Sequence, residues 1–373
     1  MSAQTEEIRQ AVRRFAAEQL APNAARWDRE KHFPKEALQG LAAMGLYGVA
    51  IAEEWGGAGM DYTALAVACE EIAAGDCSTA TIVAVNNLVA GIVSGYGNAS
   101  QKTGFLKPLA QGRMLGAFAL TEPQVGSDAS AIATRAEKHG SHYVLNGVKQ
   151  FITSGKNADV AVVFAVTAKG AGKKGISAFL VPTSTPGYKV ARIEEKTGQR
   201  ASDTAQIVLE NCKTEHLLGQ EGLGYRIALA NLESGRINVA AQATGVARTA
   251  FEAAIAYARE RKSMGKTLIE HQAVNFRLAD MATQVEAARQ LYLHAAALRD
   301  AGQPCLKEAS MAKLFASEMA EKVCSDAIQI HGGYGYVADF PVERLWRDVR
   351  VTQIYEGAND IQRLVIGRVL EEG

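Results

Sequence analysis

The sequence has little proline, no net charge and few cysteines, and each shortage excludes a class of protein. Only 8 of the 373 residues are proline and 48% are hydrophobic, which excludes a disordered or collagen-like chain. The 40 Lys and Arg residues balance 40 Asp and Glu residues, so no overall attraction to nucleic acid or an anionic membrane surface is expected. The length suggests two or three domains, at about 100 to 200 residues each.

The five cysteines form no Cys-x-x-Cys pair and lack zinc-ligand spacing. This favours reduced thiols in an intracellular protein, and we expect no metal site. No run of about 18 apolar residues occurs, so we expect no membrane span. The first ten residues contain Glu6, Glu7 and no apolar core, which argues against a signal or transit peptide. The expected location is therefore the cytoplasm.

The hydrophobic pattern predicts three successive domains, over residues 1–114, 115–216 and 217–373. Apolar residues at helical spacing fill the first domain, and Ala-rich helices buried on several sides are expected from residue 61 to 93. Long helices are predicted in the last domain, over 224–264, 271–301 and 304–330, with shorter ones after Pro341 and Asn359.

The middle domain is predicted to be a small β-sandwich or barrel. Residues 143–153 are expected to form a hairpin, because Asn146-Gly147 accepts the positive φ angles of a two-residue turn. Further strands are predicted over residues 160–166, 176–181, 188–193 and 205–209. The order of helices, strands and helices indicates an α+β protein with segregated domains.

Three segments carry polar and glycine residues that suit ligand binding, and each has a structural alternative. Residues 119–128 combine hydroxyls and free backbone N–H groups suited to a phosphate or a polar ring edge, or Ser127 and Asp128 simply cap a turn. Residues 329–336 end a helix in three glycines, for a helix cap or for close approach to a ligand. No strand precedes these glycines, which argues against a nicotinamide-binding Rossmann site.

The third segment, residues 354–363, places Glu356 between Tyr355 and Gly357 just before the last helix. A carboxylate in an apolar-flanked loop can have a raised pKa and serve as a base. The alternative is a helix-capping or solvated glutamate.

Together these three segments resemble the acyl-CoA dehydrogenase family of flavoproteins over nearly the whole chain. The stretch 329–348 matches the family's C-terminal signature, and 120–128 matches its N-terminal signature except at Val125, where a small residue is usual. The resemblance implies an N-terminal helical domain, a middle β domain and a C-terminal four-helix bundle. This agrees with the pattern read from the residues.

The resemblance also implies a reaction. Glu356 would remove the α-proton of an acyl-CoA thioester while the β-hydrogen leaves as hydride to FAD, giving the trans-2-enoyl-CoA. The backbone N–H of Glu356 and a flavin hydroxyl would stabilise charge on the thioester oxygen. Because Gly235 before Arg236 resembles the short-chain and short-branched members, we expect a short linear or branched acyl group, as in fatty acid or branched-chain amino acid catabolism.

Cofactor and substrate residues follow from position in the family's motifs. Leu120 and Thr121 would hydrogen-bond the flavin ring, Phe151 in place of the commoner Trp would cover it, and Gln329 and Gly333 would approach from a partner subunit. The full cofactor set is Phe118, Leu120, Thr121, Ser127, Phe151, Thr153, Arg261, Ser263, Gln272, Gln329, Gly332, Gly333, Ala358 and Asp360. The substrate set is Ser127, Glu233, Arg236, Tyr355 and Gly357, with Glu233 and Arg236 near the adenine and pantetheine of the CoA.

Two departures and two alternatives accompany these expectations. Ala358 replaces a usual Thr or Ser, and the lost hydroxyl would weaken FAD binding by ~1 kcal/mol; Asp360 replaces a commoner Glu or Gln. The expected partners are an electron-transferring flavoprotein and copies of the chain itself, as a homotetramer built as a dimer of dimers. The alternatives are an oxidase that passes electrons to oxygen, and a non-enzymatic helical scaffold of the same fold.

Overall fold

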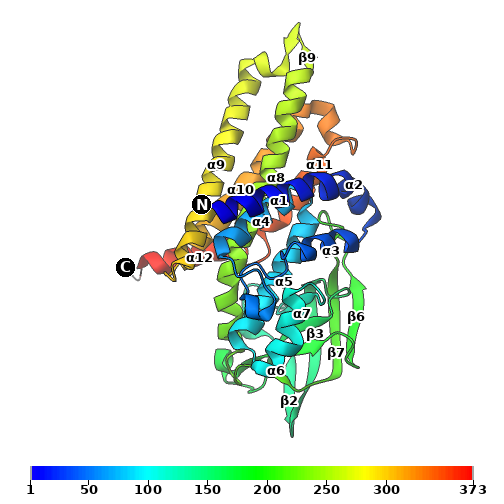
Figure 1. Ribbon diagram of the computed structural model, residues 1–373, viewed down its shortest axis with the longest axis vertical. Coiled ribbons are helices and arrows are strands. Elements are labelled where there is room, and N and C mark those ends of the chain that lie inside the picture. Colours follow the sequence, from blue (N-terminus) through cyan, green and yellow to red (C-terminus); the bar gives the residue numbers. More distant parts are fainter. Residues whose placement is uncertain (1, 372–373) are drawn as a thin grey trace.

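The computed structural model describes residues 2–371, with a β-sheet domain between two helical domains. The molecule is elongated, and Figure 1 shows the sheet at one end and the tip of the α8–α9 hairpin at the other. The predicted order of helical, sheet and helical domains is confirmed.

The N-terminal domain is built around two apolar helices. Its elements are α1 (Ala3–Phe15), a π-helical turn (Ala16–Leu20), α2 (Ala21–Glu30), α3 (Lys35–Ala43), α4 (Tyr62–Gly75), α5 (Cys77–Tyr96), α6 (Ala99–Gln101), a second π-helical turn (Lys102–Leu106) and α7 (Lys107–Ala110). Asp61 and Asp76 cap α4 and α5 by accepting hydrogen bonds from Ala64 and Thr79. Most residues of both helices are buried.

Helix α5 differs from what the sequence predicted about membrane spans. By length and composition it is apolar enough to cross a membrane, because Ser, Thr and Asn interrupt but do not outweigh its apolar residues. However, 78% of that segment is buried inside the protein. This is the burial expected of a core helix, which packs between α4, α8 and strand β1 (Gly116–Ala119).

The middle domain is an eight-stranded sheet in the order β6-β7-β3-β2-β4-β5-β8, with β1 parallel to β4. Strand β4 is apolar throughout because both of its faces are covered: Val162 and Phe164 face the core shared with α5 and α8, and Val163 faces the interior of the sheet domain. The remaining strands are β2 (Arg135–His139), β3 (His142–Thr153), β4 (Val160–Val166), β5 (Ile176–Pro182), β6 (Tyr188–Ile193), β7 (Thr204–Thr214) and β8 (His216–Leu218).

The predicted hairpin at Asn146-Gly147 is wrong. Strand β3 runs straight through this pair, and the chain turns instead at Gly140, which has a φ of +61° and joins β2 to β3. Asn146 accepts a hydrogen bond from the backbone of Asn211, where the pairing of β3 with β7 shifts register. A Cβ at Gly147 would lie 2.4 Å from the Thr134 hydroxyl, so close strand approach explains this glycine.

The C-terminal domain is a helical bundle, and its longest helix, α8, has 37 residues. Helix α8 spans Gly224–Glu260. It is followed by β9 (Lys262–Ser263), β10 (Lys266–Thr267), α9 (Gln272–Asp300), α10 (Leu306–His331), the 3₁₀ turn η7 (Gly332–Tyr336), α11 (Val342–Val349) and α12 (Asn359–Glu371). Helix α8 ends four residues before the predicted 264, because a small ribbon turns the chain at Met264 and Gly265, both with positive φ.

Strand β8 pairs with β5 and so continues the sheet beyond residue 216, after which we predicted the end of the middle domain.

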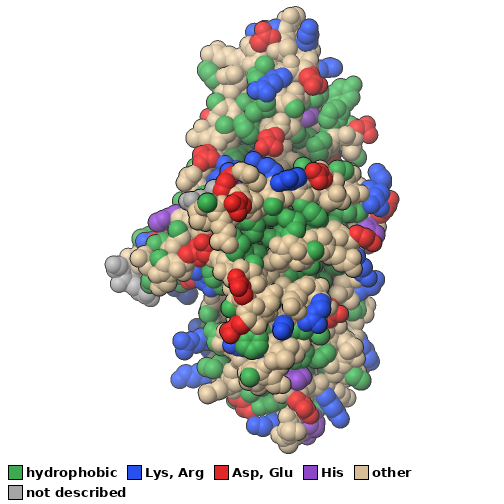
Figure 2. Space-filling model, viewed as in Figure 1, with side chains coloured by type: hydrophobic (Ala, Val, Ile, Leu, Met, Phe, Trp, Pro, Cys, Tyr) green, Lys and Arg blue, Asp and Glu red, His purple; other side chains and the backbone are tan. Residues whose placement is uncertain are grey.

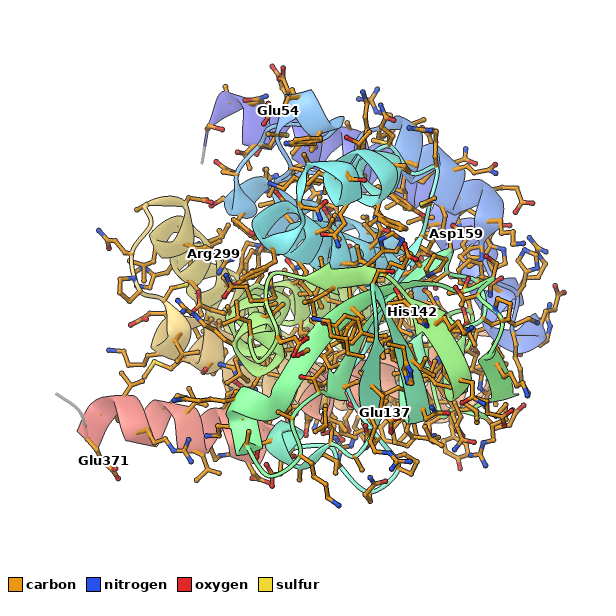
Figure 3. All side chains as sticks on the ribbon, turned by 90° about the horizontal axis from the view of Figure 1, so that it is seen from below. Glu54, Glu137, His142, Asp159, Arg299 and Glu371 are labelled. Carbon is orange, nitrogen blue, oxygen red and sulfur yellow. The ribbon has the colours of Figure 1, made fainter. Side chains whose placement is uncertain are left out.

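The surface carries both signs of charge. Acidic and basic side chains are interspersed on the face drawn in Figure 2, without a large area of one sign. Figure 3 shows α12, which ends at the labelled Glu371, projecting from the rest of the molecule.

Candidate active site

The candidate base, Glu356, lies in a tight turn between α11 and α12. Glu356 has a φ of +54° and Gly357 a φ of +90°, so two consecutive residues are left-handed. For a residue with a side chain this conformation costs about 1–2 kcal/mol and persists only when its surroundings fix it. Gln362 donates to both carbonyls of the turn, at 3.3 Å for Glu356 and 2.8 Å for Gly357.

The carboxylate of Glu356 points at helix α8, over a glycine. A Cβ added to Gly235 would lie 2.4 Å from Oε2 of Glu356, so a larger residue there would displace the carboxylate from this position. Oε2 is fully buried and accepts no hydrogen bond from the residues that the structure describes. Burial raises the pKa of Glu356 to about 7, and the positive charges of Arg236 and Lys313 act in the opposite direction.

Arg236 lies with the base in the interior. Its side chain is buried, and one guanidinium nitrogen donates to the Ser310 hydroxyl on α10 at 3.1 Å. The charge of Arg236 interacts with that of Glu356, and its expected place near the adenine and pantetheine of the CoA stays a prediction. Glu233, one turn earlier on α8, accepts from Arg299 at 2.9 Å and from the Cys305 thiol at 3.2 Å.

The residues around Glu356 in the turn differ in exposure and role. The Tyr355 hydroxyl points inward and donates to Gln242 at 2.6 Å. Ala358 is half-buried, and Asp360 is exposed at the start of α12. The backbone N–H of Glu356 makes no hydrogen bond to another residue within 2–371, so it is free to meet a ligand oxygen.

A second cluster of predicted residues lies on the middle domain. Phe151, two residues before the end of β3, has a φ of +59° and a side chain that is 62% exposed, which is unusual for a large apolar ring. Thr153 and Thr121 are half-buried, and the Thr121 carbonyl accepts from the backbone of Gln150 at 2.8 Å. Leu120 is buried beside them.

A buried ion pair holds the loop that carries Leu120 and Thr121. The Lys149 ammonium donates to Glu122 at 2.9 Å and to the Leu120 carbonyl at 3.0 Å. Neither side chain of the pair is more than 2% exposed. The pair therefore fixes the loop against strand β3.

The rest of this loop divides between core and surface. Val125, the departure from the family's small residue, is buried in the core shared with α5, whereas Ser127 is exposed. Asp128 caps the short helical turn after it by accepting from Ser130 at 3.3 Å. Phe118 is half-buried in β1, with its ring 5.1 Å from that of Phe164.

The remaining cofactor candidates lie in the C-terminal domain, at two places: where α8 passes into α9, the hairpin tip opposite the sheet in Figure 1, and where α10 passes into η7. The guanidinium of Arg261 lies over the ring of Tyr334, 5.8 Å from its centre. The exposed members of this cluster are Arg261, Ser263, Gln272, Gln329, Gly332 and Gly333. Arg261 therefore lies beside the residue that follows Gly333 in the same chain, and the approach of Gln329 and Gly333 from a partner subunit stays a prediction.

Two cavities lie near these clusters. One of about 340 Å³ lies between residues 30–33, residues 156–157 and the segment that joins β6 to β7, and none of the predicted site residues lines it. The other is small, about 10 Å³, and is lined by residues of α4, α5 and α8, including Ser234 next to Gly235. Within residues 2–371, no three His, Cys, Asp or Glu side chains gather as a metal site requires.

Comparison with known proteins identifies this arrangement. Residues 2–113, 117–212 and 222–371 match the N-terminal, middle and C-terminal domains of acyl-CoA dehydrogenase. The human mitochondrial short-chain specific acyl-CoA dehydrogenase is 46% identical over 96% of this chain and 87% of its own length. The chain belongs to the acyl-CoA dehydrogenase family.

Solved structures of the family agree with this assignment. Butyryl-CoA dehydrogenase from Megasphaera elsdenii is 40% identical and superposes with a TM-score of 0.97 over 100% of this chain and 99% of its own. A chain in a structural study of the electron transferring flavoprotein of Acidaminococcus fermentans is 42% identical, with a TM-score of 0.99 over 100% and 99% of the two chains. The resemblance to the short-chain type is therefore confirmed.

Acyl-CoA dehydrogenases are FAD-dependent oxidoreductases, and the middle-domain cluster fits that cofactor. Phe151 displays an apolar aromatic face outward, as a surface that packs against a flat ring system would. Thr121 and Thr153 place polar groups beside it. FAD is the cofactor of this protein.

Sequence analysis missed the buried lysines of this acyl-CoA dehydrogenase. Lys149 and Lys313 are both fully buried and donate to the backbone carbonyls of two predicted site residues, Leu120 and Gly357. The signal for Lys313 was present, since it occupies an apolar position of α10 between the buried Ala309, Ala312 and Ala316.

Proposed function

We propose that this protein oxidises a short acyl-CoA thioester to the trans-2-enoyl-CoA, with Glu356 as the α-proton base. The observation that carries the proposal is the buried, unpartnered oxygen of Glu356 above Gly235. A carboxylate used as a structural anchor has its oxygens satisfied, whereas a base needs an oxygen that is free to take a proton.

The chain's own residues supply both requirements of enolate formation. A pKa of about 7 lets Glu356 be ionised near neutral pH and still hold the proton that it takes from the substrate. Its free backbone N–H would donate to the thioester oxygen as negative charge develops there. Gly357 would line the thioester.

FAD, when bound, accepts the β-hydrogen of the substrate. We infer that Phe118, Leu120, Thr121, Ser127, Phe151 and Thr153 hold it from one chain. The α8–α9 hairpin tip, which carries Arg261, lies at the opposite end of the molecule from the sheet in Figure 1, so we infer that Arg261, Gln272 and Gly333 would reach this FAD from a second subunit. Ala358 would contribute less than the usual hydroxyl.

The similarity to a short-chain specific acyl-CoA dehydrogenase and to a butyryl-CoA dehydrogenase supports a short acyl group. A cavity of about 10 Å³, room for about one water molecule, lies beside α8 next to Gly235 and would have to open to admit an acyl chain. The cavity is lined by Tyr62, Leu65, Asn87, Leu88, Gly91, Asn231, Ser234 and Asn238.

Partners and location follow by inference. Exposed apolar side chains on α12, at the hairpin tip and in η7 support burial against further copies of the chain, and we propose the tetramer; among them are Leu364, Leu370, Met264 and Tyr336. The Acidaminococcus fermentans study supports an electron-transferring flavoprotein as acceptor. Five buried free cysteines fit the reducing cytoplasm.

The test is a visible spectrum of the purified holoenzyme, followed by anaerobic addition of butyryl-CoA, isobutyryl-CoA and octanoyl-CoA. We expect the flavin band to bleach fastest with one of the two four-carbon substrates. Equal or faster bleaching by octanoyl-CoA would contradict the short acyl group. A flavin band that never bleaches would contradict the reaction itself.

The electron acceptor needs a separate measurement on the same reduced enzyme. We expect slow reoxidation by oxygen and rapid transfer to an electron-transferring flavoprotein. Stoichiometric hydrogen peroxide at a rate that matches turnover would instead favour the oxidase.

A further inference from the structure

Lys313 is buried in the middle of the C-terminal bundle, close to the turn that carries Glu356. Its side chain is 0% exposed, although an ammonium group removed from water is costly unless it is compensated. None of the ion pairs found within residues 2–371 includes it. A buried lysine does not contribute to the solubility of the surface, so its charge must have another role.

The partners of Lys313 lie immediately after the candidate base. The ammonium donates to the Gly357 carbonyl at 2.9 Å and to the side-chain oxygen of Asn359 at 2.8 Å. Asn359 is itself held by the Ser317 hydroxyl at 3.1 Å. The lysine therefore links α10 to the left-handed turn and to the first residue of α12.

The charges around this group come from three elements. Glu356 lies in the turn, Arg236 on α8 and Glu318 on α10 itself, and all three interact electrostatically with Lys313. Burial lowers the pKa of Lys313 to about 7, while the charge of Glu356 raises it. Burial likewise raises the pKa of the neighbouring Tyr355 hydroxyl, which stays neutral. Arg236 and Lys313 are thus the two cations that face the base.

We propose that Lys313 is a positioning residue for the reaction: it fixes the Glu356 turn through the Gly357 carbonyl and supplies a buried positive charge that favours the ionised base. This inference rests on the proposed role of Glu356. A strained turn held by hydrogen bonds from two directions, Lys313 and Gln362, keeps its carboxylate in one orientation. The positive charge of Lys313 stabilises the ionised carboxylate of Glu356 more than its protonated form.

The test is the Lys313→Met holoenzyme, with its flavin reduced by butyryl-CoA under anaerobic conditions from about pH 5.5 to about pH 9. We expect the limiting reduction rate to fall about tenfold to a hundredfold, with a smaller change in substrate affinity. Because a lost positive charge raises the pKa of a nearby carboxyl, the rising limb of the pH profile should move to higher pH by about half a unit or more.

Two variants separate positioning from a general loss of structure. Lys313→Arg keeps the charge and should keep the pH midpoint, even if its larger head lowers the rate. Lys322→Met on the same helix is the matched control, since Lys322 is 59% exposed and pairs only with Asp326. If Lys313→Met does not fold, Lys313→Gln tests the same loss of charge with one donor retained.

The outcomes separate this inference from the proposed function. Glu356→Gln, measured in parallel, should not reduce the flavin; if it does, the base assignment fails whatever Lys313 does. If Glu356→Gln is inactive but Lys313→Met keeps the wild-type pH midpoint and rate, the role of Lys313 alone is overturned. A neutral variant with a lower melting temperature and an unmoved pH midpoint would also overturn it, because that is the result of a structural role only.

Discussion

Glu122 and Glu356 are two carboxylates with a buried lysine nearby, yet their surroundings give them opposite properties. Glu122 accepts hydrogen bonds from Lys149 at 2.9 Å, from the backbone of Ala133 at 2.6 Å and from that of Thr134 at 2.9 Å. Burial raises the pKa of Glu122, but Lys149 and these donors outweigh it, so the net pKa is lowered. For Glu356, burial wins and the pKa rises to about 7.

The donors around a carboxylate, and not its burial alone, decide what it can do. Glu122 is saturated, so it stays charged and anchors the loop of Leu120 and Thr121. Glu356 keeps one oxygen without a partner and faces its cations, Arg236 and Lys313, without a direct ion pair to either. A carboxylate with a free oxygen of this kind is able to take up a proton, which is what a catalytic base must do.

The largest expected effect comes from removing the proton acceptor. Glu356→Gln keeps the size of the side chain but cannot take the α-proton, so flavin reduction by butyryl-CoA should slow by about a thousandfold or more. FAD content and the folded state should remain, since no hydrogen bond to Oε2 is lost. Stopped-flow reduction of the holoenzyme checks this. Reduction at the wild-type rate would place the base elsewhere.

Removing Lys149 should affect stability rather than chemistry. Lys149→Met leaves Glu122 charged and buried without its cation, which should cost about 3–5 kcal/mol of the free energy of unfolding. Denaturant unfolding measures it. The double variant Lys149→Met with Glu122→Gln should recover part of the loss, because the uncompensated charge is gone. If the single variant loses less than the double one, the pair is not what anchors the loop.

The fold was largely predictable because its cues are local. The apolar run of β4 and the proline-free helical patterns of α8 and α9 predict these elements directly, and their observed bounds differ little from the predicted ones. The hairpin at Asn146-Gly147 failed because the same pair also suits a bulge, and which one forms depends on Thr134 and Asn211, far along the chain.

The candidate site was predictable by resemblance but not by physics alone. Nothing in the local sequence shows that Glu356 lies over Gly235, since 121 positions separate them in the chain. The roles of Lys149 and Lys313 likewise depend on contacts between distant segments. A lysine at an apolar helical position signals that it has a buried partner, but it does not say which one.

The two carboxylates should shift stability with pH in opposite directions. The folded-state pKa of Glu356, about 7, lies above the ordinary glutamate value of 4.5. Its contribution is therefore fully present below about pH 4.5 and is lost as the pH rises to 7, by about 3 kcal/mol. Glu122 has a lowered pKa, so its contribution is present above 4.5 and lost as the pH falls.

This difference is measurable as melting temperature against pH for the wild-type and Glu356→Gln holoenzymes. The variant should gain stability relative to the wild type between about pH 5 and about pH 7, and the gain should level off above that range. A difference in melting temperature that stays constant across the range would mean that Glu356 has an ordinary pKa. The contrast with Glu122 would then be wrong.

The smallest effect should come from trimming a single donor at Glu122. Gln124 donates to its second oxygen at 3.1 Å, and Gln124→Leu removes that bond while Lys149 and both backbone donors stay. The expected cost is about 0.5–1.5 kcal/mol in the free energy of unfolding. The acid unfolding midpoint should barely move, because three remaining donors still favour the charged form. A midpoint that rises towards pH 7 would show that the loss of one hydrogen bond is enough to raise the pKa of Glu122. Glu122 would then resemble Glu356, which has an oxygen without a donor, and the contrast between the two carboxylates would be wrong.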